Sequence, residues 1–385
     1  MSFTGKATYM SGAALSELAE DVSDIVGIVS PYETPLLDHL GEAPRPASTT
    51  FHEWLEDTLL PNKDAVQGAL VDPENDATFG VANPDYFRVG DQVQAESGRE
   101  VMLVTAIDAA VGKITVARGY GNTMPEQLAD GKVLHILGNA ALEGDDAPVA
   151  RFTTRARKGN WTQIFTAAVR VSGSDLAVRK LAVSDELDYQ KQERIRELLR
   201  DLESTVINGI SPFANPQGGA STRRTMRGII PSIATNIFQP GLAGFPAGGD
   251  LTEAQLNLAL RRVWESSASR VDTIVVGGYQ KRRINSFVTA ARGYAPSQTA
   301  FRDLVSVYES DFGVARVILC RSVPADTVLL VDSSRVDVLP LAGRSLHYKP
   351  LASSGDYESG EIIGEYTLEV RNESAHGVIR GLTSN

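Results

Sequence analysis

Residues 184–208 read SDELDYQKQERIRELLRDLESTVIN and form the most clearly helical segment of this chain. Their apolar side chains fall mostly on one helical stripe, and charges of both signs occupy the other positions. The stripe consists of Leu187, Ile195, Leu198, Leu199, Leu202, Val206 and Ile207. Ser184 can cap the start of this helix, and Gly209 can stop it. At a rise of about 1.5 Å per residue the predicted helix is roughly 37 Å long, enough to cross a whole domain.

Two strand-like arms precede the helix and are separated by a long insertion. The first arm, residues 51–60, is acidic, and the second, residues 151–171, is basic in its distal part. The charges come from Glu53, Glu56 and Asp57 in the first arm and from Arg151, Arg155, Arg157 and Lys158 in the second. Opposite charges that face each other across antiparallel strands are favourable by roughly 0.2 to 1 kcal/mol per pair. We therefore predict that the two arms pair as one long hairpin.

The insertion between the arms has the pattern of a small all-β module. Short strand-like segments are separated by frequent glycines, as expected for tight turns. These segments are residues 86–93, 100–107, 113–118 and 133–137. Strands at such close spacing predict a small barrel or sandwich at the tip of the hairpin.

The chain before the arms is predicted to be an extended N-terminal arm with too little apolar content for a core of its own. A helical amphipathic stretch carries Leu15, Leu18, Val22 and Ile25, and a proline-spaced segment follows it. The prolines are Pro31, Pro35, Pro44 and Pro46. They remove backbone donors and disfavour helix in the residues before them.

The chain after the long helix alternates helix and strand, and residues 226–341 read as an α/β domain. Helices are predicted over 251–269, where Thr252 and Gln255 form a capping box, and over 280–292. A buried strand is predicted at 273–276, and further strands are predicted around 314–319 and 327–331. Strand patterns at 361–370 and 376–379 are expected to return and pair with the structure built around the long helix.

Composition places this 385-residue chain among globular proteins, with 42% hydrophobic and 22% charged residues. The net charge of -11 argues against general affinity for nucleic acid, because phosphate binding is driven by Lys and Arg. The single cysteine, Cys320, excludes an intrachain disulfide and is expected to be a buried strand thiol. No apolar run is long enough for a membrane span and the start lacks a signal-peptide pattern, so a soluble, cytosolic protein is expected.

Sequence motifs for catalysis or cofactor binding are lacking. The five histidines lie without the spacing of a zinc helix, and neither a GxxxxGK[ST] loop nor a GxSxG elbow occurs. Gly119-Tyr120-Gly121 lacks the third glycine of a dinucleotide site, so a turn is expected there. Neighbouring carboxylates such as Glu56 and Asp57 are interpreted as solvated surface. We predict no catalytic residue, no cofactor and no metal site.

The predicted hairpin has a physical problem that points to assembly. A two-stranded hairpin is marginal alone in water, and this one would expose aromatic and aliphatic side chains. Those side chains are Phe51, Trp54, Leu55, Phe152, Trp161 and Phe165. Arms that cannot bury their own surface usually bind a neighbouring copy, and head-to-tail contacts of that kind build rings and closed shells. The predicted inter-subunit contact residues are Phe51, Glu53, Trp54, Glu56, Asp57, Arg151, Arg155, Arg157 and Trp161.

The order of these parts resembles the Hong Kong 97 fold of tailed-bacteriophage major capsid proteins. The resemblance is to the subfamily with a β-rich insertion in the extended loop, on stretches such as Phe87-Arg88-Val89-Gly90-Asp91, Met102-Leu103-Val104-Thr105, Val116-Ala117-Arg118-Gly119-Tyr120 and Glu143-Gly144. It implies an α+β chain with an N-terminal arm (1–49), an extended loop hairpin (50–66 and 149–172), an inserted β-rich domain (67–148), a peripheral domain with the spine helix (173–225 and 342–385) and an axial domain (226–341).

The same resemblance implies a function in assembly. It implies a major head protein that self-assembles into hexamers and pentamers of an icosahedral shell, which encloses double-stranded viral DNA without sequence-specific binding and without a membrane. The N-terminal stretch is too short for the scaffolding segment of some relatives, so a separate scaffolding protein is expected, together with a portal and a decoration protein. The location implied is the virion, after assembly in the host cytoplasm.

Two other classes of function are alternatives to a shell subunit. A hydrolase with its site in the α/β domain would need His, Ser and acidic residues converging in one cleft, and no such spacing occurs. A phage fibre or carbohydrate-binding module would need aromatic platforms on the inserted module. That module offers Phe79, Tyr86, Phe87 and Tyr120, which a small core can absorb.

Overall fold

In the computed structural model of the chain, the described residues are 34–41, 43–57, 59–73, 75–144, 146, 150–153, 155–177, 186–267, 270–291, 307–352 and 355–384. The amphipathic stretch predicted around Leu15 to Ile25 and the Ser184 cap therefore lie outside the described residues. The chain divides into two compact units, Met1–Trp54 with Arg157–Asn385, and Leu55–Ala156. The first unit contains the long helix with a four-stranded and a six-stranded sheet and most of a two-stranded one, and the second contains a barrel.

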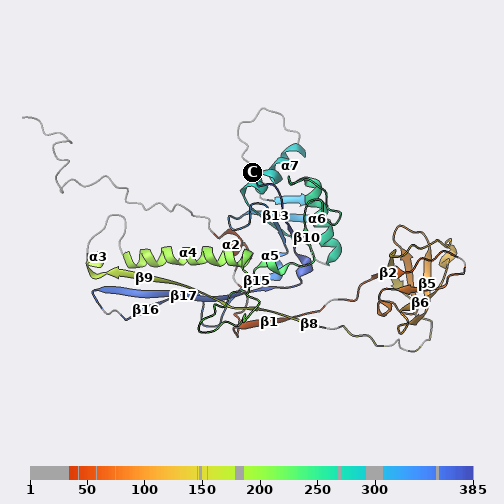
Figure 1. Cartoon of the computed structure of the whole chain (residues 1–385), viewed down its shortest axis with the longest axis horizontal. Helices are drawn as coiled ribbons and strands as arrows, with labels where there is room; N and C mark the ends of the chain where they lie inside the picture. The colour runs from red at the N-terminus through yellow and green to blue at the C-terminus, as the bar shows by residue number, and fades with distance from the viewer. Residues whose placement is uncertain are drawn as a thin grey trace, which may run out of the picture. The chain divides into compact units, whose positions relative to one another are not determined.

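The long helix, α4 (Glu186–Asn208), packs on one face of a four-stranded sheet (Figure 1). Its buried side chains include Leu198, Leu202, Val206 and Ile207, as the apolar stripe predicted. They join a core with Phe165 and Val169 of the sheet. The helix is therefore held by burial of one face.

The sheet beneath α4 joins strands from distant parts of the sequence. The order is β15 (Val336–Pro340), β17 (Tyr357–Val370), β16 (His347–Leu351), and β9 (Gln163–Ser172) pairs with β17 from Tyr357↔Ser172 to Tyr366↔Gln163. The return of the C-terminal segment to the structure around the long helix is thus confirmed for β17.

The predicted hairpin is longer than the one observed. Only β8 (Ala156–Trp161) pairs with β1 (Phe51–Glu56), whereas β9 leaves the hairpin and pairs with β17. The basic residues of the second arm lie only in its distal part, residues 151–158. Further along, the alternating apolar residues Phe165, Val169 and Val171 gain burial beneath α4, which a two-stranded hairpin cannot provide.

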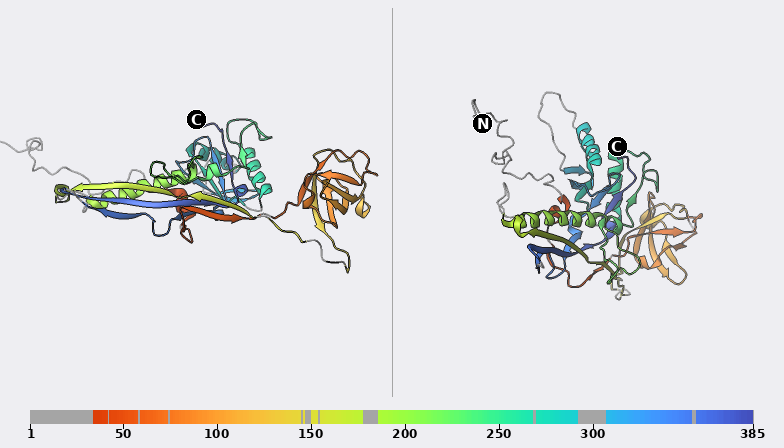
Figure 2. Two further views of the ribbon diagram at one scale, coloured as in Figure 1. Left: turned by 60° about the horizontal axis from the view of Figure 1, so that its bottom comes forward. Right: turned by 60° about the vertical axis from the view of Figure 1, so that its left-hand side comes forward.

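A second sheet of six strands forms the α/β part of the first unit (Figure 2). Its order is β10 (Ile237–Phe238), β18 (Gly377–Ile379), β14 (Val328–Val331), β11 (Thr273–Val276), β13 (Gly313–Leu319) and β12 (Val307–Ser310). The helices are α6 (Glu253–Ser266), with the predicted Thr252–Gln255 capping box, and α7 (Gly278–Ala291). The strand predicted at 376–379 therefore pairs here, with β14 and β10, and not beneath α4. Its residues Val378 and Ile379 are fully buried between the two cores.

The second unit is a closed six-stranded barrel, in agreement with the predicted small β module. Its order is β2 (Lys63–Gln67), β3 (Thr78–Val81), β6 (Lys113–Ala117), β5 (Val101–Asp108), β4 (Asp91–Ala95) and β7 (Val133–Asn139). The strand expected over 86–93 begins only at Asp91, because Pro84–Tyr86 forms a 3₁₀ turn and a second turn, with positive φ at Gly90, follows it. Gly119 and Gly121 both have positive φ, so this segment is a turn as expected.

The barrel unit contains a buried ion pair between Arg118 and Glu100. Arg118 donates from Nε and Nη2 to the two oxygens of Glu100, each at 2.7 Å. Glu100 also accepts the backbone N–H groups of Gly119 and Glu126. Burial alone would raise the pKa of Glu100, but these hydrogen bonds and the Arg118 charge hold it below its usual value.

The remaining helices are short. They are α2 (Pro35–Leu40), α3 (Gly173–Ala177), α5 (Ile229–Ser232) and the 3₁₀ turns Tyr120–Asn122, Ser333–Arg335 and Glu373–Ala375. The backbone N–H groups of Leu36 and Leu37 in α2 donate to one oxygen of Glu203, at 3.1 and 3.2 Å. Glu203 is a fully buried residue of α4, so this carboxylate attaches α2 to the long helix.

Truncation of the long helix is expected to cost much of the stability of the first unit. Leu202→Ala removes a side chain that is 3% exposed, so we expect the free energy of unfolding to fall by about 2 to 5 kcal/mol. Arg200→Ala, on the outer face of α4, is the control and should change it by less than about 0.5 kcal/mol. Urea unfolding of the unassembled protein measures both, and equal losses would contradict the assigned buried face.

Stability is also expected to fall in mild acid because of His376. This fully buried residue accepts the Asp332 N–H at Nδ1, and burial lowers its pKa from 6.5 to about 4, against the opposing effect of the Asp332 carboxylate. Between those values the unfolded chain binds the proton more readily, so the free energy of unfolding decreases as the pH falls. We expect His376 to contribute a loss of about 2 kcal/mol between pH 7 and pH 5.

Urea unfolding at a series of pH values measures this contribution. His376→Gln should remove it, whereas His347→Gln, at an exposed position of β16, should keep the wild-type slope. A slope unchanged by His376→Gln would show that this residue is not the source.

Candidate functional site

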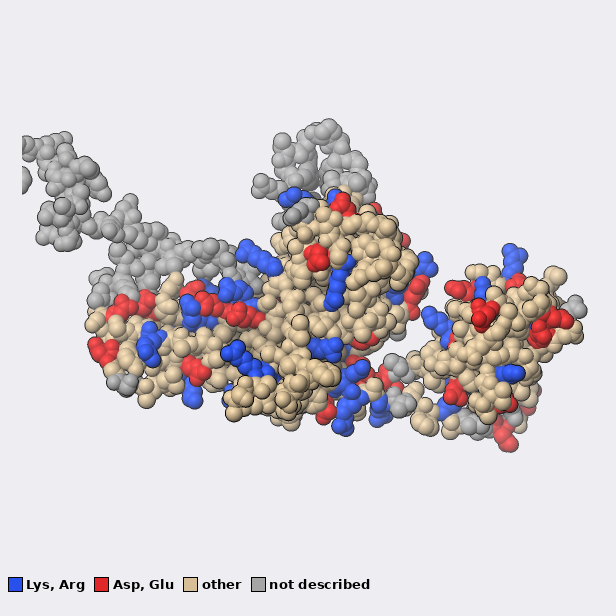
Figure 3. Space-filling model, in the orientation of Figure 1, with Lys and Arg blue, Asp and Glu red and all other residues tan. Residues whose placement is uncertain are grey.

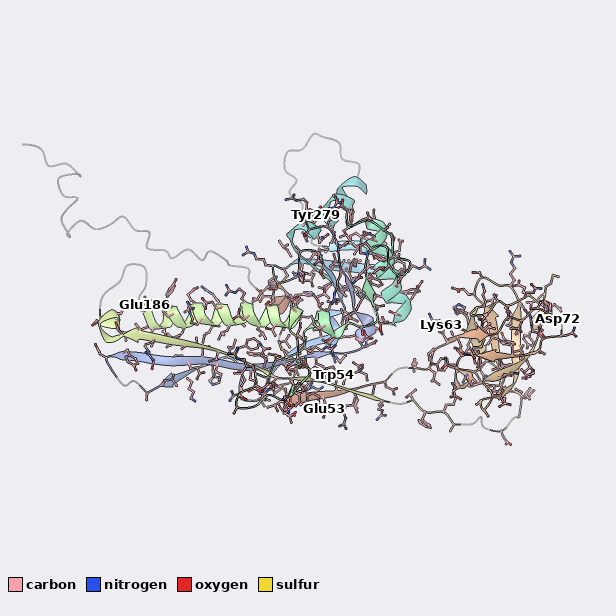
Figure 4. The ribbon with its side chains drawn as sticks, in the orientation of Figure 1. Glu53, Trp54, Lys63, Asp72, Glu186 and Tyr279 are labelled. Carbon is pink, nitrogen blue, oxygen red and sulfur yellow. The ribbon has the colours of Figure 1, made fainter. Side chains whose placement is uncertain are left out.

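Strands β1 and β8 form a two-stranded ribbon that continues from the sheet beneath α4 (Figures 1 and 4). Glu53 of β1 lies 3.6 Å from Arg157 of β8, so the pairing inferred from charge is observed for these residues. Both side chains are largely exposed, at 42% and 72%. An ion pair this exposed contributes little stability, so it favours the pairing without being sufficient to hold it.

The aromatic residues of the ribbon are less exposed than the sequence predicted. The Phe51 and Trp161 rings pack at 4.5 Å between centroids, and both residues are half-buried. A Cβ atom at Gly159 would lie 2.6 Å from the Phe51 ring, so the absence of a side chain at Gly159 lets this ring lie across β8. Trp54 is half-buried, and its ring lies 5.9 Å from that of His52. The strongly exposed apolar side chains here are Leu55, at 62%, and Phe152, at 88%.

The other predicted contact residues are divided between the ribbon and the barrel unit. Glu56 ends β1, and Arg155 is exposed directly before β8. Asp57 accepts a hydrogen bond from Thr153 Oγ1 at 2.8 Å. Arg151 is exposed but donates to the carbonyl of Asp85, within the barrel unit, so it is not part of the paired ribbon. Its charge matched the acidic arm, but the strand pairing ends before reaching it.

Buried polar contacts hold the root of the ribbon against β17. His52 Nε2 lies 2.6 Å from Glu369 Oε2, and Glu369 is 2% exposed. Arg371 and Arg45 lie near the same carboxylate, at 3.7 and 4.0 Å. A buried carboxylate is costly unless it is paired. Removal of His52 would therefore take away the nearest of these three partners of Glu369.

The second strand is held in the same way. Asn160 donates from Nδ2 to the carbonyls of Leu368 and Arg227, at 2.9 and 2.8 Å, and its Oδ1 accepts the N–H of Arg227. Thr162, the residue between β8 and β9, donates to Glu365 Oε1 at 2.6 Å.

Glu365 is the centre of this attachment. It is 3% exposed and lies 2.5 Å from Arg224 Nη2 and 2.8 Å from Arg344 Nε. Arg224 also donates to the Thr162 carbonyl at 2.8 Å. One carboxylate thus joins the ribbon strand, the return strand and two loops.

These root residues are not among the contact residues predicted from the sequence. Glu365 and Glu369 alternate with Thr367 inside the apolar strand β17, on one face of the sheet. Carboxylates in such a strand are a signal of buried pairing, because an unpaired buried charge is costly. The partners could not be identified, because Arg224 and His52 are distant in sequence.

The described residues offer little for metal or thiol chemistry. No group of three or more His, Cys, Asp or Glu among them is arranged to hold a metal ion. No helix in the described ranges is long and apolar enough to cross a membrane. Cys320 follows β13 directly and is 1% exposed, as expected for a buried thiol. Burial, with a hydrogen bond to Glu203, raises the pKa of Cys320 to about 12, so it is a poor nucleophile.

Charges of both signs are interspersed on the face shown in Figure 3. Along α4, for instance, Arg194 pairs with Glu197 and Arg196 with Glu193. Cations that are already paired have less to offer a phosphate backbone than a continuous basic stripe would have. These four charges of the long helix therefore neutralise one another in pairs.

Comparison with known proteins agrees with this architecture. The profile of the family described as SU10 major capsid protein matches residues 3–383. A search of curated proteins finds no match. The chain is similar to a structure from Microbacterium phage Oxtober96, with a TM-score of 0.53 and 13% identity over 98% of this chain and 99% of that chain.

Two further solved structures have comparable similarity. One is from Gordonia phage Cozz, with a TM-score of 0.52 and 12% identity over 100% of this chain and 98% of that one. The other is a capsid of an empty GTA particle, with a TM-score of 0.52 and 10% identity over 98% and 100%.

At these identities the likeness shows the fold, and it confirms the α+β, Hong Kong 97-like class predicted from the order of elements. The family match extends over nearly the entire chain, and the fold likeness has the same extent. This chain therefore belongs to the SU10 major capsid protein family, whose members are shell-forming structural proteins of bacteriophage virions.

Proposed function

We propose that copies of this chain assemble as hexamers and pentamers of an icosahedral shell, in which the ribbon of each copy lies on a neighbour. One observation carries this proposal. The root of the ribbon is held by buried contacts at Glu365 and Glu369, while Leu55 further along remains 62% exposed. A firmly attached ribbon with uncovered apolar surface is suited to bind another copy.

The proposed contact surface contains the residues that were expected from the sequence. Glu53, Arg157 and Arg155 offer charge, and the packed Phe51 and Trp161 rings stiffen the ribbon. The remaining members of the proposed contact set are Trp54, Glu56, Asp57 and Arg151. Leu55 is added because it is strongly exposed.

The division into parts is proposed along the lines that the sequence indicated. We infer an N-terminal arm at 1–49, a ribbon that corresponds to the extended loop, an inserted barrel within 67–148, and peripheral and axial domains in the remainder. The closed barrel and the two separate sheets support this division.

We infer that the shell encloses double-stranded DNA without reading its sequence. Residues 55–156 contain sixteen acidic and eight basic residues, so they account for -8 of the net charge of -11. A surface of this sign is repelled by phosphate, which supports a barrel that does not contact packaged DNA.

Further parts of the proposal concern partners, place and chemistry. A separate scaffolding protein, a portal and a decoration protein are proposed as partners, and assembly is proposed to occur in the host cytoplasm. We also propose that the chain catalyses no reaction. The membership in a structural family supports this over a hydrolase or a carbohydrate-binding fibre.

The proposed ribbon contact is tested by Leu55→Asp. Burial of a leucine contributes about 1.5 to 3 kcal/mol, so its loss from a contact that each copy repeats should raise the concentration needed for assembly at least about tenfold. Light scattering and negative-stain microscopy measure this concentration and the particles formed.

Val111→Asp is the matched control, because Val111 is also 62% exposed but lies on a turn of the barrel. It should assemble like the parent chain, and circular dichroism should show both variants folded. If Leu55→Asp forms normal shells at the normal concentration, the ribbon is not the contact.

A further inference from the structure

Strand β9 forms a long margin of the sheet beneath α4, beside β17 (Figure 2, left view). Among the described residues, β9 pairs with β17 alone. It has ten residues with a single charge, Arg170, and no lysine or proline. The opposite margin, β16, has five residues and carries Lys349 and Pro350, which discourage pairing. The edge of β9 is therefore the one suited to accept another strand.

A groove lies between β9 and α4. It has a volume of about 260 Å³ and is lined by residues 168–171 of β9, by Asp175, and by Glu186, Gln190 and Arg194 of α4. The three α4 residues are four apart, so they lie on one stripe of the helix, and Glu186 marks its start (Figure 4). Backbone groups on one side and a helix on the other are what an extended peptide needs for strand addition.

The chain itself contains a suitable segment. Residues 24–30, which precede the described residues, read DIVGIVS, with four β-branched apolar residues among seven. Such a composition favours an extended strand.

Length and direction agree with this occupant. Helix α2 is held at Glu203, nine residues along α4 from Arg194, which corresponds to about 14 Å of helix. Residues 30–34 can span about the same distance when extended. Strand β9 runs towards α3, and α4 runs in the opposite direction, towards the residues that bind α2 (Figure 1). A segment that leads from this groove into α2 therefore runs along α4 and is antiparallel to β9.

We propose that residues 24–30 bind the groove between β9 and α4 of their own chain as an added antiparallel strand. The N-terminal arm then covers the unprotected edge of the sheet before any other copy meets it.

Disulfide trapping in the full-length chain tests this placement. Ala168→Cys, at an exposed position of β9, is combined with a cysteine substituted singly at each of positions 25 to 29. Successive residues of a strand point to opposite faces, so crosslinking should alternate along the five positions, with the favoured ones at least fivefold above the others. Ala14→Cys with Ala168→Cys is the control and should crosslink no better than the unfavoured positions.

Mixing isotope-labelled with unlabelled copies before oxidation identifies the donor chain. Crosslinked peptides of one isotope only, found by mass spectrometry, support the proposal. Uniformly low yields would overturn it, and so would peptides of mixed isotopes, which would assign the groove to the arm of a second copy.

Hydrogen exchange gives a second, independent measurement. Ile28→Pro removes a strand donor, so amides within residues 164–171 should exchange at least tenfold faster than in the parent chain. Met10→Pro, outside the proposed strand, should leave them unchanged. Equal exchange in the Ile28→Pro variant and the parent would overturn the proposal.

Discussion

The attachment of the ribbon to the sheet depends on two carboxylates of β17 that are buried where the ribbon begins. Glu365 and Glu369 are 3% and 2% exposed, and each is surrounded by hydrogen-bonding groups from other segments. Burial of a charge is costly unless the charge is paired, so these contacts favour a single arrangement of the segments around the two carboxylates. A two-stranded ribbon cannot hold its own direction in water, and here its base is specified by the sheet to which it is bound.

The continuity of one strand carries this constraint to the core. Only Thr162 separates β8, which belongs to the ribbon, from β9, which packs beneath α4. The hydroxyl of Thr162 binds Glu365, so the junction itself is attached to β17. The burial of Phe165, Val169 and Val171 under the long helix therefore stabilises the base of the ribbon as well. A rigid base and an exposed far part suit a family whose members must join many identical copies into a shell.

A third buried carboxylate joins the N-terminal side to this core. Glu203 of α4 accepts N–H groups from α2 and the thiol of Cys320, which follows a strand of the second sheet. Burial raises the pKa of Glu203, since its hydrogen bonds only partly offset the loss of water. Helix α2, helix α4 and the end of β13 meet at this residue, as the ribbon, β17 and two loops meet at Glu365. Polar contacts thus specify how the segments connect, whereas apolar burial supplies most of the stability.

Local pattern was enough to predict the elements, because a helix or strand follows from the period of its apolar residues. The stripe of α4, the capping box of α6 and the glycine-punctuated strands of the barrel were identifiable in this way, and so was the charge pairing of Glu53 with Arg157. The partner of each strand could not be predicted in this way, because the local pattern does not show which segments β9 and β18 pair with. Nor were the partners of Glu365, Glu369 and Asn160 predictable. Strand partners and buried charge networks join residues far apart in the chain, so they exist only when the whole fold has formed.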